Sequence, residues 1–288
     1  MTISRSRFGA LLAALALGGT NLAGCATSTP LAGSTDASKA TAPDPALRAA
    51  IDSSARTPAN RARDGARHPL DTLAFFGLRP DQTVVEIWPG GALWWSEILA
   101  PYLADHGRYI AAIPAPGFPG ENTERARSTF EARIAADPAR LGRAERVEFN
   151  ALDTDFVPPN SVDVVLTFRN LHNWIAADRG ASAFAAMFRA LKPGGVLGIE
   201  DHRADPAAPA DVSMQNGYVR EADAIALAQA AGFRLVARSE INANPRDDKN
   251  HPRGVWTLPP VYRLGDVDRE KYAAIGESDR FTLKFVKP

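Results

Sequence analysis

A hydrophobic run that ends in an acid, a glycine-bearing turn and a helical pattern follow one another in "TVVEIWPGGALWW", residues 83–95. Glycine lets the backbone approach a ligand without Cβ atoms, and the start of the following helix favours a negatively charged group. Gly90 and Gly91 meet this need, although Trp88 and Ala92 stand where such turns often carry glycine. The stretch predicts a cofactor turn, with a ligand-free strand–helix turn as the alternative.

Two further segments place polar side chains after apolar runs. "FRNLHNW" brings together Asn170, His172, Asn173 and Trp174, and "EDHR" carries Asp201 and His202. Histidine titrates near neutral pH and is suited to removing a substrate proton. A helix cap or a filled polar pocket is the alternative for His172. The two imidazoles and a carboxylate would also suit a metal ion, but no short-spaced ligand motif is present, so no metal is predicted.

The elements that position these residues alternate between β-branched runs and helical patterns. Seven runs are typical of strands: 83–87, 108–113, 146–152, 161–168, 196–201, 234–241 and 280–286. This order predicts an α/β fold with a doubly wound, seven-stranded, mostly parallel sheet and an antiparallel last strand. Ligands bind at the carboxyl ends of such strands, so the polar segments should share one site. Residues 44–78 predict an N-terminal helical extension, and residues 242–279 a long lid-like insertion.

The segments "VVEIWPGG", "DVVLTFRNLHNW", "LKPGGVLGIEDHR" and "AGFRLV" resemble class I S-adenosylmethionine (SAM)-dependent methyltransferases, over about residues 70–288. More narrowly, "GVWTLPP" and "ESDRFTLKFVKP" are similar to a family of exported bacterial proteins, predicted methyltransferases. The fold implied is the Rossmann-like methyltransferase fold, and the cofactor implied is SAM. One departure is clear: the stretch after the second strand has Ile113 where these enzymes usually carry the acid that binds ribose.

The resemblance also implies roles for individual residues. Cofactor contacts fall to Glu86, Pro89, Gly90, Gly91, Asn150 and Asp153, and catalysis to His172, His202 and Asn170. For Asn150 and Asp153, turn capping is the common alternative role. The residues expected to line the acceptor site are Asn173, Trp174, Asp201, Tyr218, Arg220, His251 and Trp256.

The N-terminus has the pattern of a bacterial export signal. Arg5 and Arg7 precede the short apolar run "FGALLAALALGG", and "LAGC" resembles a lipobox that ends at Cys25, the chain's single cysteine. Residues 1–25 are expected to be a lipoprotein signal peptide, residues 26–43 a flexible tether and residues 44–288 the methyltransferase-like domain. The protein is then exported and lipid-anchored on the periplasmic face of the cell envelope, in the outer membrane because Ala26 follows the cysteine. A secretory signal with a chance cysteine is the alternative.

Lysine plus arginine equals aspartate plus glutamate at 33 each, which argues against a nucleic-acid partner. The function expected is a SAM-dependent methyltransferase of a small or envelope-associated acceptor. SAM is made in the cytosol, which leaves two alternatives: a non-catalytic adenosyl-ligand-binding or envelope module, or a different His-dependent enzyme. The sequence leaves the acceptor and the oligomeric state open.

Overall fold

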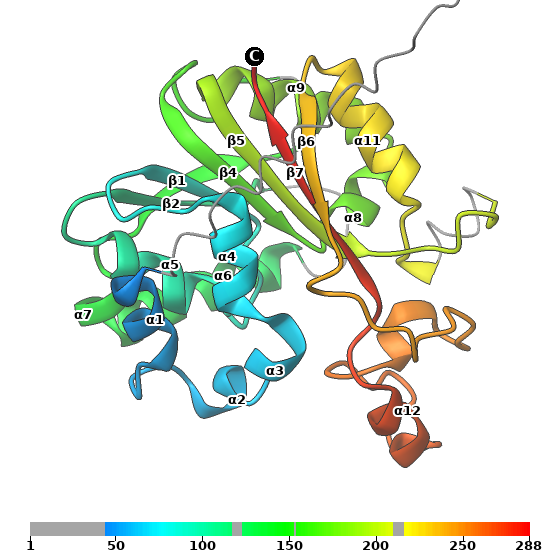
Figure 1. The fold of residues 1–288 in the computed structure, drawn as a ribbon. Coiled ribbons are helices and arrows are strands. Elements are labelled where there is room, and N and C mark those ends of the chain that lie inside the picture. Colours follow the sequence, from blue (N-terminus) through cyan, green and yellow to red (C-terminus); the bar gives the residue numbers. More distant parts are fainter. Residues whose placement is uncertain (1–43, 117–122, 153, 210–215) are drawn as a thin grey trace, which may run out of the picture. The chain divides into compact units, whose positions relative to one another are not determined.

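The computed structural model describes residues 44–116, 123–152, 154–209 and 216–288, which build one α/β unit around a seven-stranded sheet (Figure 1). The strands are β1 (Thr83–Ile87), β2 (Arg108–Pro114), β3 (Glu145–Phe149), β4 (Val162–Phe168), β5 (Leu191–His202), β6 (Arg234–Ser239) and β7 (Arg280–Val286). Their order in the sheet is β3-β2-β1-β4-β5-β7-β6. The strands β1 to β5 run parallel, and β7 runs antiparallel between β5 and β6. The doubly wound sheet that the sequence predicts is therefore confirmed.

Short helices surround this sheet. Those of the chain's first half are α1 (Pro45–Asp52), α2 (Pro58–Arg61), α3 (Asp64–Arg67), α4 (Pro69–Phe76), α5 (Ser96–Leu103), α6 (Thr123–Ala136) and α7 (Pro138–Leu141). The second half carries α8 (Leu171–Ala176), α9 (Gly180–Ala190), α11 (Glu221–Ala230), the 3-10 helix η1 (Gly254–Thr257) and α12 (Arg269–Ile275).

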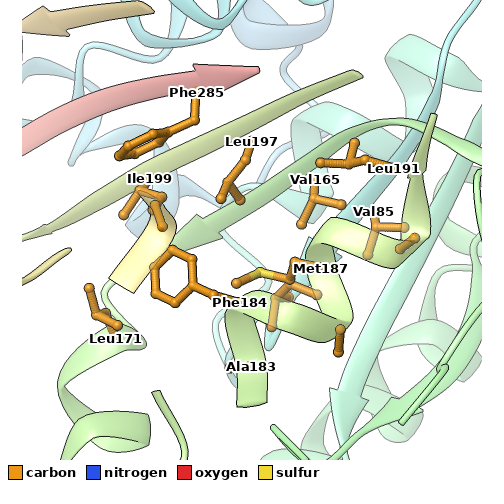
Figure 2. Packing of buried hydrophobic residues seen from close by; sticks show 14 of the residues in the cluster. Val85, Val165, Leu171, Ala183, Phe184, Met187, Leu191, Leu197, Ile199 and Phe285 are labelled. Carbon is orange, nitrogen blue, oxygen red and sulfur yellow. The ribbon is translucent and has the colours of Figure 1, made fainter. Parts of the chain in front are cut away.

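Side chains that alternate along the strands feed two separate cores, one on each face of the sheet. In β1, Val85 and Ile87 join the core beneath α8, α9 and α11, whereas Val84 joins the core beneath α1, α4 and α5. Figure 2 shows the first of these cores, where Phe184 and Met187 of α9 lie against the sheet. Glu86 points to the same face as Val84, and it is as buried as its apolar neighbours.

The strand order reverses between β1 and β4, which are neighbours in the middle of the sheet. Connections after these two strands go to opposite faces, so a crevice opens beyond their carboxyl ends. The α2–α3 segment and the segment 242–279 lie at this same end of the sheet (Figure 1). The fold thus gathers residues from four distant stretches of the chain around one crevice.

The strand β5 begins at Leu191, five residues before the start expected at Val196. Leu191 pairs with Val162, and the register then shifts so that Val164 faces Val196. The "KPGG" residues 192–195 therefore form an irregularity without register partners in β4, with the Gly194 N–H donating to Lys287 O and Gly194 in the left-handed region at φ +78°. Glycine accepts this conformation at little cost.

Candidate active site

A cavity of about 420 Å³ lies beyond the carboxyl ends of β1 and β4, a size typical of small-molecule sites. The sequence-predicted residues that line it are Glu86, Pro89, Gly90, Gly91, Asn170, His172, Asn173, His202 and Trp256. They come from β1 and the turn after it, from the turn after β4 and the start of α8, from the end of β5 and from the segment 242–279. The structure thus brings both predicted catalytic histidines and the predicted cofactor turn to one cavity.

The turn after β1 presents backbone to this cavity. Gly90 has φ +70°, and a Cβ atom there would meet nothing within 4 Å. The backbone conformation, rather than crowding, therefore requires glycine at this position. A valine at Gly90 would strain the turn besides filling the cavity.

Glu86 holds an unusual carboxyl at the floor of the cavity. Its Oε2 accepts hydrogen bonds from Ser96 Oγ at 2.9 Å and from Tyr109 OH at 2.5 Å. Burial raises the pKa of Glu86 to about 7, and the two hydroxyls offset this rise only in part. At neutral pH this carboxyl is therefore poised between its charged and uncharged forms, and a bound cation would favour the charged form.

Trp88 occupies the position of the first glycine in related turns, with a left-handed φ of +49°. Its backbone N–H donates to Ala112 O in β2, and its indole Nε1–H donates to Phe149 O at the end of β3. Because β2 lies between β1 and β3, the indole must cross the carboxyl end of β2. It also packs edge-on against Trp174, with ring centroids 5.7 Å apart.

Asn170 joins the ends of the two central strands. Its Nδ2 donates to Ile87 O at 2.8 Å, so the side-chain amide ties the turn after β4 to the end of β1. Arg169, just before it, has a left-handed φ of +60° and lines the cavity. The amide of Asn170 therefore acts first as a positioning group for the switch point.

His172 and Asp201 form a buried pair at the start of α8. Asp201 Oδ1 lies 3.3 Å from His172 Nδ1, and Asp201 Oδ2 accepts the Leu171 N–H at 2.7 Å. An ionised carboxylate beside Nδ1 favours the tautomer with the proton on Nδ1, which leaves Nε2 as the basic nitrogen. Asp201 does not line the cavity. Its carboxylate holds the His172 ring in one orientation, which a general base needs.

His202 lies beside this pair. The His172 and His202 ring centroids are 5.6 Å apart, as expected for two side chains at the ends of neighbouring strands. His202 Nδ1 and Ser278 Oγ are hydrogen-bonded at 2.6 Å. Burial lowers the pKa of His202 well below its usual value, and the neighbouring His172 and Arg169 lower it further. The imidazole of His202 is therefore neutral at physiological pH.

Six of the residues predicted from the sequence do not line this cavity. They are Asn150, Trp174, Asp201, Tyr218, Arg220 and His251. The Asn150 Oδ1 accepts the Leu152 N–H and so caps a turn, while Trp174 is fully buried behind Trp88. Arg220 pairs with Asp223 on the outer face of α11. Asp153 and Cys25 lie outside the described residues.

Tyr218 and His251 both contact the carboxylate of Asp247, which lies behind the cavity. Tyr218 OH donates to Asp247 at 3.0 Å, and His251 Nε2 lies 2.8 Å from Asp247 Oδ1. The Asp279 N–H donates to Asp247 Oδ2 at 2.8 Å. This buried carboxylate fastens the segment 242–279 to the start of β7, which is a structural role.

The cavity also contains residues that sequence reasoning missed. They include Arg67, Trp94, Trp95, Arg169, Glu277 and Ser278. A signal existed for three of them, because Arg169 directly precedes Asn170, and Glu277 and Ser278 come two to three residues before the start of β7. Arg67 lies in a short helix without a distinctive pattern.

The part of the chain that the structure describes holds no helix long and apolar enough to cross a membrane.

A model of a methyltransferase domain family matches residues 118–199, less than a third of the chain. A SAM-dependent methyltransferase from Aquifex aeolicus shares the fold at a TM-score of 0.53 and 16% identity, over 81% of this chain and 95% of that chain. A putative sarcosine dimethylglycine methyltransferase from Galdieria sulphuraria has a TM-score of 0.51 at 13% identity, over 79% and 85% of the two chains. The [4+2]-cyclase SpnF has a TM-score of 0.50 at 18% identity, over 80% and 81%. A search of curated protein sequences finds no match.

These comparisons confirm the Rossmann-like methyltransferase fold and support the expectation of a methyltransferase domain. The cyclase SpnF shows that this fold also carries other activities, so the chemistry follows from the site and not from the fold.

Proposed function

We propose that the protein is a SAM-dependent methyltransferase that acts on a small-molecule acceptor. The observation that carries the proposal is the meeting, on one cavity at the β1–β4 switch point, of a glycine turn, the Glu86 carboxyl and the His172–Asp201 pair. The domain match over residues 118–199 and the shared fold support the same conclusion.

The residues at the cavity fit the methionyl part of SAM. The amides of Gly90 and Gly91 suit its carboxylate, and Glu86 suits its ammonium group. The fit is different for the adenosyl part. The strand β2 ends in Ile113 and Pro114, and no carboxylate follows it as far as residue 116, where the described stretch ends. The Trp88 indole offers an aromatic surface at this place instead.

When bound, SAM supplies an activated methyl group for attack by a nucleophile. The chain's own contribution is to orient the acceptor and to take up its proton. His172 is placed for that transfer because Asp201 fixes its ring and stabilises the imidazolium that forms. Trp256, with its ring centroid 6.0 Å from that of His172, closes this side of the cavity.

His172→Gln should reduce methyl transfer by about 100-fold or more, because the general base is lost. Asp201→Asn should also reduce it, because an amide no longer favours the productive tautomer. The measurement is transfer of a tritiated methyl group from SAM into small molecules extracted from the protein's own cells. His251→Gln is a control, since His251 is buried away from the cavity. If His172→Gln and the wild type transferred equal amounts of tritium, His172 would not be the general base.

A different His-dependent reaction is the second candidate. It is favoured by the Trp88 indole across the end of β2 and by the Ser278–His202 hydrogen bond, neither of which methyl transfer needs. The missing ribose acid supports this candidate as well as a non-catalytic binding module. Failure of the protein to bind SAM or S-adenosylhomocysteine would favour these alternatives.

We further propose that the chain is lipid-anchored through Cys25, on the periplasmic face of the outer membrane. This proposal rests on the sequence alone, namely on Arg5 and Arg7, the short apolar run that follows them and the "LAGC" segment. Cys25→Ser should move the protein from the membrane pellet to the soluble fraction, because the thiol that carries lipid is absent. Fractionation and immunoblotting of cells measure this shift. If all of the variant protein stayed in the membrane pellet, this result would argue against lipidation.

A further inference from the structure

A group of arginine side chains converges on the cavity near His202. Four arginines and two glutamates form this arginine cluster: Arg63, Arg67, Arg169, Arg280, Glu200 and Glu277. They come from the α2–α3 segment, from the turn after β4, from β5, from the end of the segment 242–279 and from the start of β7. Arg63, Arg67, Arg169 and Glu277 line the cavity, whereas the other two lie behind them. Four guanidinium groups therefore face two carboxylates.

The two glutamates are already engaged. Glu277 accepts hydrogen bonds from Arg63 Nε at 2.7 Å and from Arg67 Nε at 3.3 Å. Arg280 Nη1 lies 2.9 Å from Glu200 Oε1 and 3.3 Å from Glu277 Oε2. Each glutamate thus pairs with Arg280, and neither has capacity to neutralise the whole group. Glu86, a third carboxyl on the cavity, is hydrogen-bonded to Ser96 and Tyr109 instead.

Several guanidinium nitrogens remain without a partner. Within the described residues, Arg67 Nη1 and Nη2, Arg63 Nη2 and Arg169 Nε are buried and make no hydrogen bond. The Arg67 side chain is only 1% exposed, and its guanidinium lies 4.8 Å from the centre of the Trp94 ring. Its two free nitrogens form the planar fork that matches a carboxylate or phosphate.

Such an arrangement is costly in a protein without a ligand. Buried cations are normally paired, and a buried donor without an acceptor destabilises the fold. Burial lowers the pKa of Arg67 well below its usual value, and the neighbouring Arg169 lowers it further. An incoming anion would relieve both penalties, because it would supply acceptors and negative charge together.

We propose that the arginine cluster binds an oxyanion, a carboxylate or phosphate group, of the acceptor substrate, with Arg67 as its central contact. The assignment to the acceptor rests on the proposed function. One observation favours the acceptor over the cofactor. Glu277, which pairs with Arg63 and Arg67, directly precedes Ser278, whose hydroxyl is hydrogen-bonded to His202, so the cluster adjoins this histidine. The cofactor's carboxylate already has suitable donors in the amides of the glycine turn.

Calorimetric titration of the full-length protein with inorganic phosphate and with malonate, at constant ionic strength, tests this proposal. We expect at least one of the two anions to bind the wild type, and Arg67→Met to bind it about tenfold more weakly or not at all. Arg61→Met is the matched control, because Arg61 is exposed in the neighbouring helix α2 and forms no part of the cavity. This control should bind as the wild type does.

A second titration, with S-adenosylhomocysteine in saturating anion, separates the acceptor from the cofactor. Unchanged affinity for S-adenosylhomocysteine supports an acceptor site. Competition between the two ligands, with loss of S-adenosylhomocysteine binding in Arg67→Met, would overturn the proposal and make the cluster a cofactor site. The absence of binding by both anions, or equal binding by wild type and Arg67→Met, would overturn the anion site itself. Anion binding without any S-adenosylhomocysteine binding would keep the anion site but remove its assignment to a methyl acceptor.

Discussion

Replacing Glu277 with glutamine should lower the free energy of unfolding by about 3–5 kcal/mol at pH 7. The variant leaves Arg63, Arg67 and Arg280 around a neutral amide, so buried positive charge stays uncompensated. Although burial alone would raise it, the pKa of Glu277 is held at about 2 by Arg67, Arg280 and other arginines. Since the folded-state value lies below the unfolded value of about 4.5, this stabilisation is complete above pH 4.5. It should disappear as the pH falls toward 2.

Urea unfolding at several pH values measures this effect. Glu270→Gln is the control, because Glu270 is exposed on α12, and it should stay within about 0.5 kcal/mol of the wild type. The double variant Arg67→Met with Glu277→Gln should recover part of the loss, since one of the unpaired cations is removed with its partner. A stability of Glu277→Gln equal to that of the wild type at pH 7 would contradict the role given to this carboxylate.

Glu86→Gln should act in the opposite direction and make the protein more stable at pH 8, by about 3 kcal/mol. The cause is burial, which raises the pKa of Glu86 from 4.5 to about 7. The folded state then binds the proton more tightly than the unfolded state does. Unfolding free energy therefore falls as the pH rises from 4.5 to 7, and the glutamine variant lacks this decline.

The measurement is the midpoint of thermal unfolding between pH 5 and pH 8. Glu124→Gln, an exposed position on α6, should keep the pH dependence of the wild type. If Glu86→Gln showed the same dependence as the wild type, Glu86 would not be the group that titrates. A gain in stability combined with weaker cofactor binding would identify Glu86 as a residue retained for function.

The sequence alone was sufficient to predict the sheet and the part of the site that holds the glycine turn and the two histidines. Buried β-branched runs such as "TVVEI" identify strands by their composition, and the rule that ligands bind at strand ends then joins residues from separate motifs. The meeting of His172 and His202 followed in this way, because each comes at or just after the end of one of two neighbouring strands. The antiparallel strand β7 was equally predictable, since the alternating run at residues 280–286 indicated a strand of different character.

The other half of the site depends on contacts that no local pattern reveals. Arg67 and Glu277 are 210 residues apart, and only the packing of α3 against the start of β7 brings them together. The role of Asp201 was hidden for the same reason, because its carboxylate reaches His172 at the start of α8 while it also accepts the backbone N–H of His202. The role of Trp88 was also hidden, since its reach to β3 depends on the left-handed backbone at that position.

Calorimetric titration of the full-length protein with S-adenosylhomocysteine at pH 8 tests the central claim most directly. We expect one site per chain with a dissociation constant below about 100 μM, and binding about tenfold weaker in Glu86→Gln, which loses the partner of the ammonium group. A wild-type protein that releases no heat of binding up to millimolar ligand would contradict the claim that the β1–β4 cavity holds this cofactor.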